Sequence, residues 1–238
     1  MAVTLRFSAG DLVVVTGAGS GIGRATARLL AEAGLTVACW DLTGETAAEV
    51  AGAVGGSADT VDVTDAGQVA GAFARLGRPA RYLVNNAGPA SLAPVTFAEG
   101  LVMGVGSMET VTRAWLAGDP PPQAAVVNVA SVAGNVLGAS PDWYSATKGA
   151  VAGWTRHLAV VHASRLRANA VAPGMIATPR SAGFSDSPAL MAALARNPLG
   201  RMGEPEEIGG VIAFLLSPLA AYVNGTLVVA DGGWSVAP

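Results

Sequence analysis

The sequence predicts an α/β fold with a doubly wound parallel sheet and helices on both faces. Short apolar runs rich in β-branched residues alternate with helical stretches along the 238 residues. Glycine, proline or a polar residue follows most of the apolar runs, at the edge of such a sheet where ligands bind. No linker and no repeat interrupts the alternation, so we predict one domain over residues 1–238.

The alternation predicts seven strands, at 12–16, 35–40, 58–62, 81–84, 124–129, 166–171 and 226–229. The predicted helices cover 24–33, 65–76, 102–116, 143 to about 163, and 204–216. Gly34 directly follows the first helix and is a natural C-terminal cap, because glycine readily adopts the left-handed conformation that ends many helices.

The first strand runs straight into a glycine-rich turn that opens the first helix. The turn contains Gly17, Ser20, Gly21, Ile22 and Gly23. Glycines at this place permit a tight turn and let backbone N–H groups approach a pyrophosphate. Asp41 ends the second strand about twenty residues later, where a carboxylate can bind a ribose 2′-hydroxyl. The turn and the acid together indicate a dinucleotide site.

Lys148 is the only lysine of the chain, because the other thirteen basic residues are all arginine. It follows Tyr144 by four positions on a predicted helix, so the phenol and the ammonium share one face. A cation beside a phenol favours the phenolate and lowers its pKa, as a general acid/base requires. On these five residues alone, an ordinary amphipathic helix with a stray lysine remains an equal alternative.

Bulk composition excludes several other classes of protein. The net charge is −3 and the arginines are scattered, so no nucleic-acid partner is expected. No apolar stretch approaches the roughly 18 residues of a membrane helix, and we expect neither a membrane contact nor a signal peptide. The single cysteine, Cys39, excludes an intrachain disulfide and favours a reducing compartment, so we predict a cytoplasmic protein.

Four segments stand in a fixed order along the chain. They are Thr-Gly-Ala-Gly-Ser-Gly-Ile-Gly at 16–23, Asn-Asn-Ala-Gly at 85–88, Ser131 with Tyr144 and Lys148, and Asn-Ala-Val-Ala-Pro-Gly at 169–174 followed by Thr178. Ser131 precedes Tyr144 by thirteen residues. In this order and spacing they resemble the short-chain dehydrogenase/reductase family over nearly the whole chain.

The resemblance implies a Rossmann fold with a seven-stranded sheet, and hydride transfer to or from a nicotinamide. Tyr144 would protonate or deprotonate the substrate oxygen, and Ser131 would hold that oxygen by a hydrogen bond. Lys148 would bind the nicotinamide ribose and lower the pKa of Tyr144. The implied cofactor contacts are Gly17, Ser20, Gly21, Ile22, Gly23, Asp41, Asp62, Val63, Asn85, Ala87, Gly88, Tyr144, Lys148, Pro173, Gly174, Ile176 and Thr178.

Asp41 predicts NAD rather than NADP as the cofactor. Its carboxylate would accept hydrogen bonds from a ribose 2′-hydroxyl and would repel a 2′-phosphate. Neither the glycine turn, where Ser20 stands, nor the two residues after Asp41 supply a compensating base. Asp62 and Val63 would flank the adenine.

Two features depart from the family pattern. The segment between Gly88 and the predicted helix 102–116 is several residues shorter than expected. The family also has an asparagine in this helix, followed three residues later by a small residue, and here Gly104 and Ser107 occupy those positions. The fourth member of the family's catalytic set is therefore missing.

These departures leave open a second class of function, a dinucleotide-binding regulator or scaffold with little catalysis. A Ser/His hydrolase is not favoured, because Ser131 lacks the flanking glycines of a nucleophile elbow. We predict no metal site, because His157 and His162 lie five residues apart on one helix rather than four.

The substrate pocket is predicted from residues after Gly88, from 135–143 and from 175–196. Its members include Leu137, Trp143, Met175, Ile176, Phe184 and Leu190. They favour a small apolar or neutral secondary alcohol or ketone. The resemblance implies a homotetramer or homodimer, assembled through the helices that carry Tyr144 and Gly104 and through the last strand.

Overall fold

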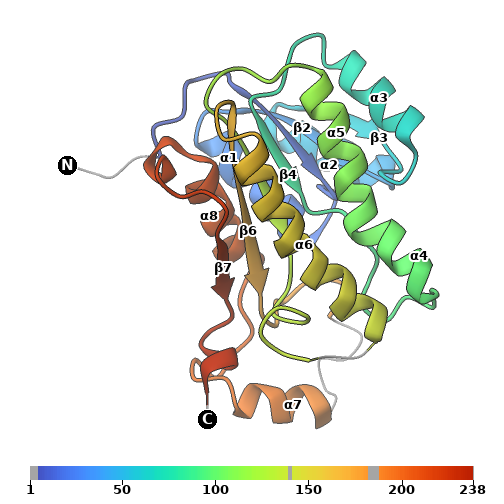
Figure 1. Ribbon diagram of the computed structural model, residues 1–238, viewed down its shortest axis with the longest axis vertical. Helices are drawn as coiled ribbons and strands as arrows, with labels where there is room; N and C mark the ends of the chain where they lie inside the picture. The colour runs from blue at the N-terminus through green and yellow to red at the C-terminus, as the bar shows by residue number, and fades with distance from the viewer. Residues whose placement is uncertain (1–4, 139–140, 182–187, 238) are drawn as a thin grey trace.

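A seven-stranded parallel sheet forms the centre of the molecule, with helices on both faces (Figure 1). The computed structural model describes residues 5–138, 141–181 and 188–237. Within them the strand order is β3-β2-β1-β4-β5-β6-β7, and all six neighbouring pairs are parallel. The order reverses between β1 and β4, where a doubly wound sheet opens a crevice for a ligand. The predicted fold class is confirmed.

The strands are β1 Leu12–Thr16, β2 Thr36–Asp41, β3 Ser57–Thr60, β4 Tyr82–Asn85, β5 Ala124–Val129, β6 Leu166–Pro173 and β7 Leu227–Ala230. Every residue of β1 and of β5 is buried, because helices cover the sheet on both sides. Double burial is why these strands appear in the sequence as continuous apolar runs. The predicted strand 58–62 extends beyond the observed one, because β3 ends at Thr60 and Asp62 lies in the loop that follows.

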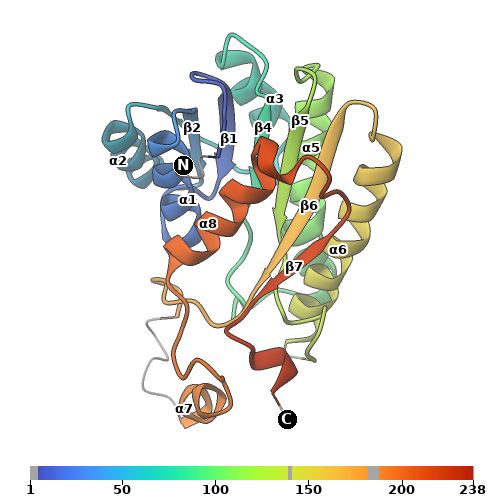
Figure 2. The same ribbon diagram turned by 90° about the vertical axis from the view of Figure 1, so that its left-hand side faces the viewer.

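Two layers of helices enclose the sheet (Figure 2). One layer holds α1 Gly21–Glu32, α2 Gly44–Val54 and α8 Pro205–Leu216, and the other holds α3 Ala66–Arg75, α5 Ser107–Ala117 and α6 Asp142–Val161. The sequence analysis does not predict α2. Its buried positions are Ala47, Val50 and Ala51, and alanine gives a weak apolar pattern.

The predicted helix 102–116 is not one regular helix. It begins earlier as α4 Phe97–Leu101, continues through a π-helical turn at Val102–Gly106, and ends as α5. Thr96 caps α4: Thr96 Oγ1 accepts from the amide of Glu99 at 3.3 Å, and Thr96 donates its own amide to Glu99 Oε2 at 2.8 Å. This cap fixes where the segment after β4 turns into a helix.

The C-terminal part of the chain extends beyond the carboxyl ends of the strands. There α7 Pro188–Ala195 and a short 3₁₀ turn at Trp234–Val236 lie below the sheet in the view of Figure 1. Among the described helices, none has the length and apolar character needed to cross a membrane.

Candidate functional site

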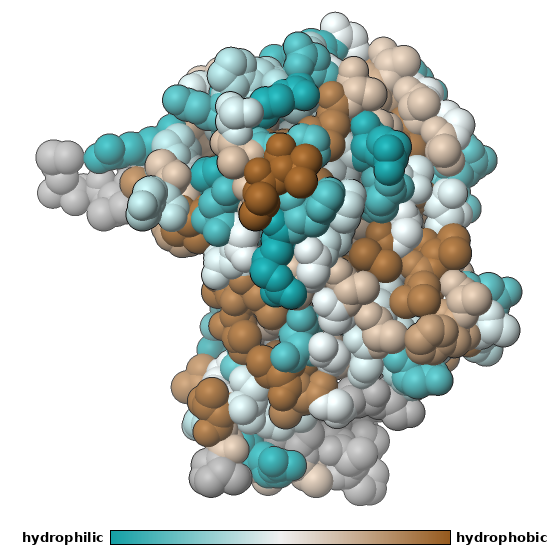
Figure 3. All heavy atoms as spheres, viewed as in Figure 1, coloured by the Kyte–Doolittle hydropathy of each residue, from teal (hydrophilic) through white to brown (hydrophobic). Residues whose placement is uncertain are grey.

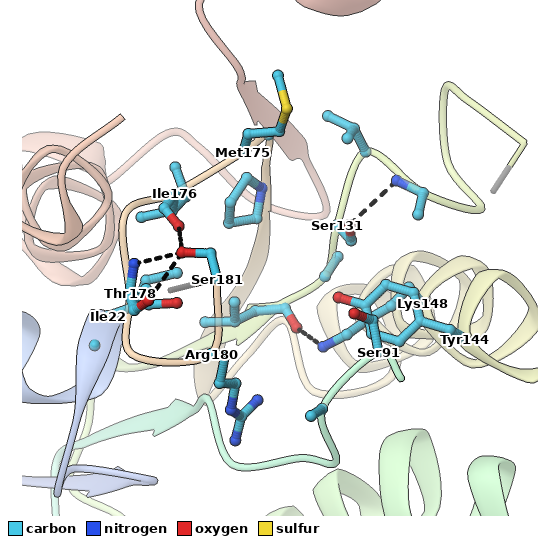
Figure 4. Close-up of a pocket in the computed structure, with 18 of the residues that line it drawn as sticks. Ile22, Ser91, Ser131, Tyr144, Lys148, Met175, Ile176, Thr178, Arg180 and Ser181 are labelled. Carbon is cyan, nitrogen blue, oxygen red and sulfur yellow. Dashed lines mark hydrogen bonds between the residues drawn. The ribbon is translucent and has the colours of Figure 1, made fainter. Parts of the chain in front are cut away.

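A cavity of about 570 Å³ lies at the carboxyl ends of β1, β4, β5 and β6. In the close-up of Figure 4, Ser131, Tyr144 and Lys148 lie on one side of it, and Ile22, Thr178 and Ser181 lie on the other. The predicted site residues that line it are Gly17, Ser20, Gly21, Ile22, Ser131, Tyr144, Lys148, Pro173, Gly174, Ile176 and Thr178. The structure therefore brings residues from four separate segments to one place.

The glycine turn forms one wall, and its glycines are required by backbone conformation and by close packing. Gly17 and Gly21 have φ values of 65° and 51°, in the left-handed region that side chains disfavour. A Cβ at Gly17 would lie 2.8 Å from Asn86 Nδ2, and one at Gly21 would lie 3.1 Å from Thr178 Cγ2. The backbone can therefore approach both neighbouring segments and leave the N–H groups at the start of α1 open to the cavity.

Gly23 belongs to the same wall but does not line the cavity. A Cβ on it would lie 2.6 Å from Asn86 Nδ2 and would overlap the carbonyl of Gly17. Its smallness lets α1 pack closely against the turn.

Ser131, Tyr144 and Lys148 form the opposite wall. Lys148 is only 9% exposed, and its Nζ donates to the backbone carbonyl of Val129 at 2.9 Å. The same Nζ lies 5.9 Å from the centroid of the Tyr144 ring. Ser131 Oγ accepts a hydrogen bond from the amide of Ala133 at 3.1 Å, which fixes its position after β5. The lysine thus lies beside the tyrosine, as their spacing on α6 predicts.

Burial is the largest cause of the pKa shifts of Tyr144 and Lys148. It raises the pKa of the Tyr144 phenol, while a side-chain hydrogen bond with Ser131 and the charge of Arg180 act in the lowering direction. Burial also lowers the pKa of Lys148 to about 8, with a further lowering from Arg180. The expected lowering of the Tyr144 pKa is thus opposed by desolvation in the protein without a cofactor.

Asn135 connects the Ser131 segment to α6, and sequence reasoning missed this role. Its Nδ2 donates to the carbonyl of Ser131 at 2.8 Å and to that of Lys148 at 2.9 Å. Gly134 beside it has φ 76°, and a Cβ there would overlap the backbone of Ser145 on α6. No local motif marks Asn135, because its two partners come from different elements.

Asp41, Asp62 and Val63 lie outside the lining of the cavity. The carboxylate of Asp41 accepts from the amide of Gly19 at 2.8 Å and from that of Thr43 at 3.1 Å. Asp41 therefore sits against the glycine turn, beyond the cavity. Asp62 accepts from the amide of Thr64 at 2.9 Å and is partly buried, as is Val63.

The side chain of Asn85 points into the core instead of into the cavity. It is 1% exposed, and its Nδ2 donates to Thr112 Oγ1 on α5 and to Asn128 Oδ1 on β5, both at 2.9 Å. Asn128 in turn donates to Thr155 Oγ1 on α6 at 2.9 Å. This network ties two central strands to two helices.

Asn86, which the sequence analysis did not select, lines the cavity. Its Nδ2 donates to the carbonyls of Thr16 and Gly17, each at 3.1 Å, and so fixes the glycine turn to β4. Ala87 donates its amide to Thr16 Oγ1 at 3.1 Å. Gly88 presents its carbonyl to Arg180 at 2.8 Å. The alternation of side chains along an extended chain could have indicated that neighbouring asparagines face opposite ways.

The apolar part of the cavity agrees only in part with the predicted pocket. Leu137, Met175 and Ile176 line it. Trp143 does not: it is 3% exposed and packs on α4, where a Cβ on Gly100 would lie 2.6 Å from its ring. Phe184 and the side chain of Leu190 lie outside the described part of the structure. Leu92, Arg180 and Arg196, which fall in the predicted pocket segments, also line the cavity. Asn86, Met202 and Trp234 line it as well and lie outside the predicted segments.

Gly104 lies in the π-helical turn, packed against α6. A Cβ on it would overlap Thr147 Oγ1 and would lie 2.9 Å from Thr147 Cγ2. The Thr147 hydroxyl accepts a hydrogen bond from the amide of Val105 at 2.9 Å. Ser107 Oγ donates to the carbonyls of Met103 and Gly104 at 2.9 and 2.8 Å. The bend is therefore present without the asparagine side chain.

The chain is similar to known proteins over nearly its whole length. Residues 17–235 match a family model described as Enoyl-(Acyl carrier protein) reductase. A cis-4-hydroxycyclohexanecarboxylate dehydrogenase of Sinomonas cyclohexanicum is 40% identical over 94% of this chain and 96% of the relative. A cyclohexanol dehydrogenase of Acinetobacter is 37% identical over 94% of each chain. A solved short-chain dehydrogenase/reductase from Brucella melitensis is 28% identical with a TM-score of 0.86, over 98% and 99% of the two chains.

Proposed function

Because the chain belongs to the short-chain dehydrogenase/reductase family, we propose that it interconverts a secondary alcohol and its ketone with a nicotinamide dinucleotide. The observation that supports this best is the arrangement of the two walls. Ser131, Tyr144 and Lys148 face the cavity from one side and the glycine turn from the other. The cofactor, when bound, supplies or accepts the hydride.

The glycine turn fits the diphosphate of such a cofactor. Side chains at Gly17 or Gly21 would fill the space beside Asn86 and Thr178. The start of α1 adds N–H groups and the positive end of a helix dipole, both of which favour an anion. The residues that would hold the diphosphate are Gly17, Ser20, Gly21, Ile22 and Thr178.

Tyr144 is the proposed general acid/base. In alcohol oxidation its phenolate takes the hydroxyl proton of the substrate, and in ketone reduction its phenol returns that proton. Ser131 donates a hydrogen bond to the same oxygen and so stabilises the charge that develops on it. Lys148 lies beside the phenol and favours the phenolate through its positive charge. Two of its three N–H donors remain for a ribose, because Val129 takes one.

Turnover with a panel of secondary alcohols tests this function. We expect reduced cofactor to form with at least one cyclic alcohol, and ketone reduction to consume it. Binding of the cofactor measured on the same samples separates the two classes of function. Tight binding with no turnover on a broad panel of alcohols and ketones would contradict the proposed enzyme.

We propose NAD as the preferred cofactor. Asp41 is fixed beside the glycine turn by two backbone amides, where a carboxylate suits a 2′-hydroxyl and repels a 2′-phosphate. Arg24 is a basic residue in contact with the glycine turn, because its Nε donates to the carbonyl of Gly19 at 3.0 Å. It is engaged by Glu49 at 3.2 Å, which reduces its attraction for a phosphate.

Titration of both reduced cofactors tests this preference. Wild type should bind NADH more tightly than NADPH. Asp41→Ser should reduce the difference by roughly 10-fold, the value of one charge-assisted hydrogen bond. Tighter binding of NADPH by wild type would contradict the proposal.

The proposed substrate is a small, largely apolar ring alcohol or the corresponding ketone. Leu92, Leu137, Met175, Met202 and Trp234 give the cavity an apolar lining suited to such a ring. Two of the relatives carry the names of cyclohexane alcohols, one neutral and one with a carboxylate. These two compounds are therefore the first substrates to try.

A homotetramer is the proposed assembly. Apolar surface gathers over the end of α6 and beside β7 (Figure 3). The exposed apolar residues include Val160 and Val161 on α6, Phe214 on α8, and Val229 on β7. Two such faces on one subunit suit the D2 symmetry common among tetramers. Light scattering that shows only a 23.6 kDa monomer at micromolar concentration would contradict it.

The predicted cytoplasmic location rests on the single cysteine, and cell fractionation tests it.

A dinucleotide-binding regulator remains the second candidate, because Gly104 replaces the asparagine of the family. In the family that asparagine bends the helix, and its carbonyl holds a water that passes protons to the lysine. Here the bend persists, and the carbonyl of Gly104 accepts from Ser107 instead. We therefore expect an active enzyme with slow proton exchange, whose turnover rate is reduced roughly 10- to 100-fold. Solvent deuterium isotope effects on turnover test this: a fast enzyme with no such effect would show that Gly104 does not impair the relay.

A further inference from the structure

Arg180 spans two segments that are far apart in the sequence. It follows β6, and its Nη2 donates at 2.8 Å to the carbonyl of Gly88, which lies in the loop after β4. The turn that carries it is fixed by Ser181, whose Oγ donates to Ile176 at 2.9 Å and accepts from the amide of Thr178 at 2.9 Å. The position of Arg180 is therefore set at its backbone by the Ser181 turn and at its guanidinium by Gly88.

Both ends of this bridge adjoin the glycine turn. Thr178 lies against Gly21, with its Cγ2 3.1 Å from the place of a Cβ there. At the other end, Ala87 lies against Gly17, with its Cα 3.0 Å from the place of a Cβ there. In Figure 4, Arg180 lies between the side of the cavity that carries Ile22 and Thr178 and the side that carries Ser91 and Tyr144. The guanidinium thus crosses the open side of the turn.

Within the described part of the chain, the charge of Arg180 has no counterpart. Of the described residues that line the cavity, Lys148, Arg180 and Arg196 are cations and none is an aspartate or glutamate. Among the residues that the structure describes, no carboxylate forms an ion pair with Arg180. A guanidinium has five N–H donors, and the contact with Gly88 uses one. Several donors therefore remain for an anionic ligand.

The geometry points to Arg180 as a clamp for the diphosphate of the bound dinucleotide, an inference that rests on the proposed function. The diphosphate would lie between the start of α1 and the guanidinium. Arginine suits this role because its planar fork can donate two parallel hydrogen bonds to one phosphate. The contact with Gly88 holds the fork across the turn before the ligand arrives, so less entropy is lost on binding.

A carboxylate on the substrate is the other anion that Arg180 could meet. The glycine turn adjoins both ends of the Arg180 bridge, whereas Leu137, Met202 and Trp234 reach the cavity from other segments. Arg196, which follows α7, also lines the cavity and lies in the same part of the chain as Met202. We therefore assign the diphosphate to Arg180, and the test includes the substrate.

The test compares Arg180→Gln and Arg180→Lys with wild type and with Arg28→Gln. Arg28 is exposed on α1, outside the lining of the cavity, so Arg28→Gln removes the same charge from the surface. Dissociation constants are measured for NADH by its fluorescence, and for ADP and adenosine by competition. ADP has the diphosphate and adenosine has none. Thermal melts without ligand report whether each variant is folded.

Arg180→Gln should weaken NADH and ADP by roughly 10-fold and leave adenosine unchanged, because one charge-assisted contact to a phosphate is lost. Arg180→Lys should recover part of the affinity. Arg28→Gln should match wild type. NADH affinity should also depend less on salt in Arg180→Gln than in wild type.

The inference is overturned if NADH and ADP bind Arg180→Gln as tightly as wild type, or if adenosine is weakened as much as ADP. It is also overturned if the variant loses only the turnover of cis-4-hydroxycyclohexanecarboxylate and keeps that of cyclohexanol, since Arg180 would then serve the substrate. Failure of wild type to bind NADH would reject the proposed function itself. If wild type binds NADH and Arg180→Gln binds it equally tightly, only the clamp is rejected and the proposed function stands.

Discussion

The helix that carries the proposed catalytic residues and the helix beside it are held in different ways. On α6, polar contacts fix Lys148 to its surroundings: Asn135 binds its backbone carbonyl, and its ammonium binds Val129. The neighbouring π-helical turn approaches α6 through the bare backbone of Gly104. The comparison shows that the π-helical turn forms without the family's asparagine side chain, because close backbone packing at Gly104 sets its geometry. The same departure at a position that acts through a side chain would remove a function.

Tyr144→Phe should have the largest effect, because it removes the proposed acid/base and keeps the ring. We expect kcat to fall by roughly 10²- to 10⁴-fold with the affinity for NADH little changed. The control is Tyr222→Phe, because Tyr222 is fully exposed on the surface. A Tyr144→Phe enzyme with more than a tenth of wild-type kcat would contradict the role of the phenol.

Asn135→Ala tests whether the α6 side depends on polar side chains. The variant loses two hydrogen bonds that join the Ser131 segment to α6, and we expect kcat to fall by roughly 10-fold. The affinity for NADH should change less than kcat. Asn224→Ala is a matched control: Asn224 also makes two side chain–backbone bonds, but its partners Ala159 and Ala168 do not line the cavity, whereas Ser131 and Lys148 do. Equal losses of kcat in the two variants would show that Asn135 has only a general structural role.

Lys148→Met should stabilise the protein without a cofactor while it removes activity. Burial lowers the pKa of Lys148 from 10.5 to about 8, so the folded state holds this proton less tightly than the unfolded state. Below pH 8 both states are protonated and the penalty is constant. Between about 8 and 10.5 the unfolded state binds more protons, so the Lys148 contribution to stability rises with pH.

At pH 7 the substitution should therefore raise the free energy of unfolding by roughly 1–3 kcal/mol, measured by urea denaturation. The difference between Lys148→Met and wild type should shrink as the pH rises toward 10. A variant less stable than wild type at pH 7 would show that the hydrogen bond to Val129 outweighs desolvation.

Thr147→Val tests the neighbouring helix and should have the smallest effect. The hydroxyl of Thr147 accepts from the amide of Val105, and its loss leaves a partly buried N–H group without this partner. We expect a loss of roughly 1 kcal/mol in the free energy of unfolding and less than a threefold change in kcat. The control Thr110→Val removes a hydroxyl that donates to the carbonyl of Gly106. It deprives no amide of its acceptor, so the free energy of unfolding should fall by less than in Thr147→Val. A large loss of kcat in Thr147→Val would mean that this helix also positions the site through side chains.

Local patterns predict the sheet well because each central strand is buried on both faces and carries its own apolar run. The glycine turn, Ser131, Tyr144 and Lys148 could be selected because they lie close together in the sequence or at fixed spacings. Asn135 and the π-helical turn could not, because the hydrogen bonds of Asn135 and the packing of Gly104 on Thr147 join separate elements. Trp143 belongs to the predicted pocket segment 135–143 but is buried against α4, because residues adjacent on a helix, such as Trp143 and Tyr144, face different directions.

The central claim, that this protein moves a hydride from a carbinol carbon to a nicotinamide, is tested most directly by isotope transfer. Wild type is incubated with oxidised cofactor and secondary alcohols that carry deuterium on the carbinol carbon, cyclohexanol first, with Tyr144→Phe as the inactive reference. Mass spectrometry of the reduced cofactor should show one deuterium per molecule formed, with far less product from the variant. Reduced cofactor without deuterium, or equal product from wild type and Tyr144→Phe, would contradict the account.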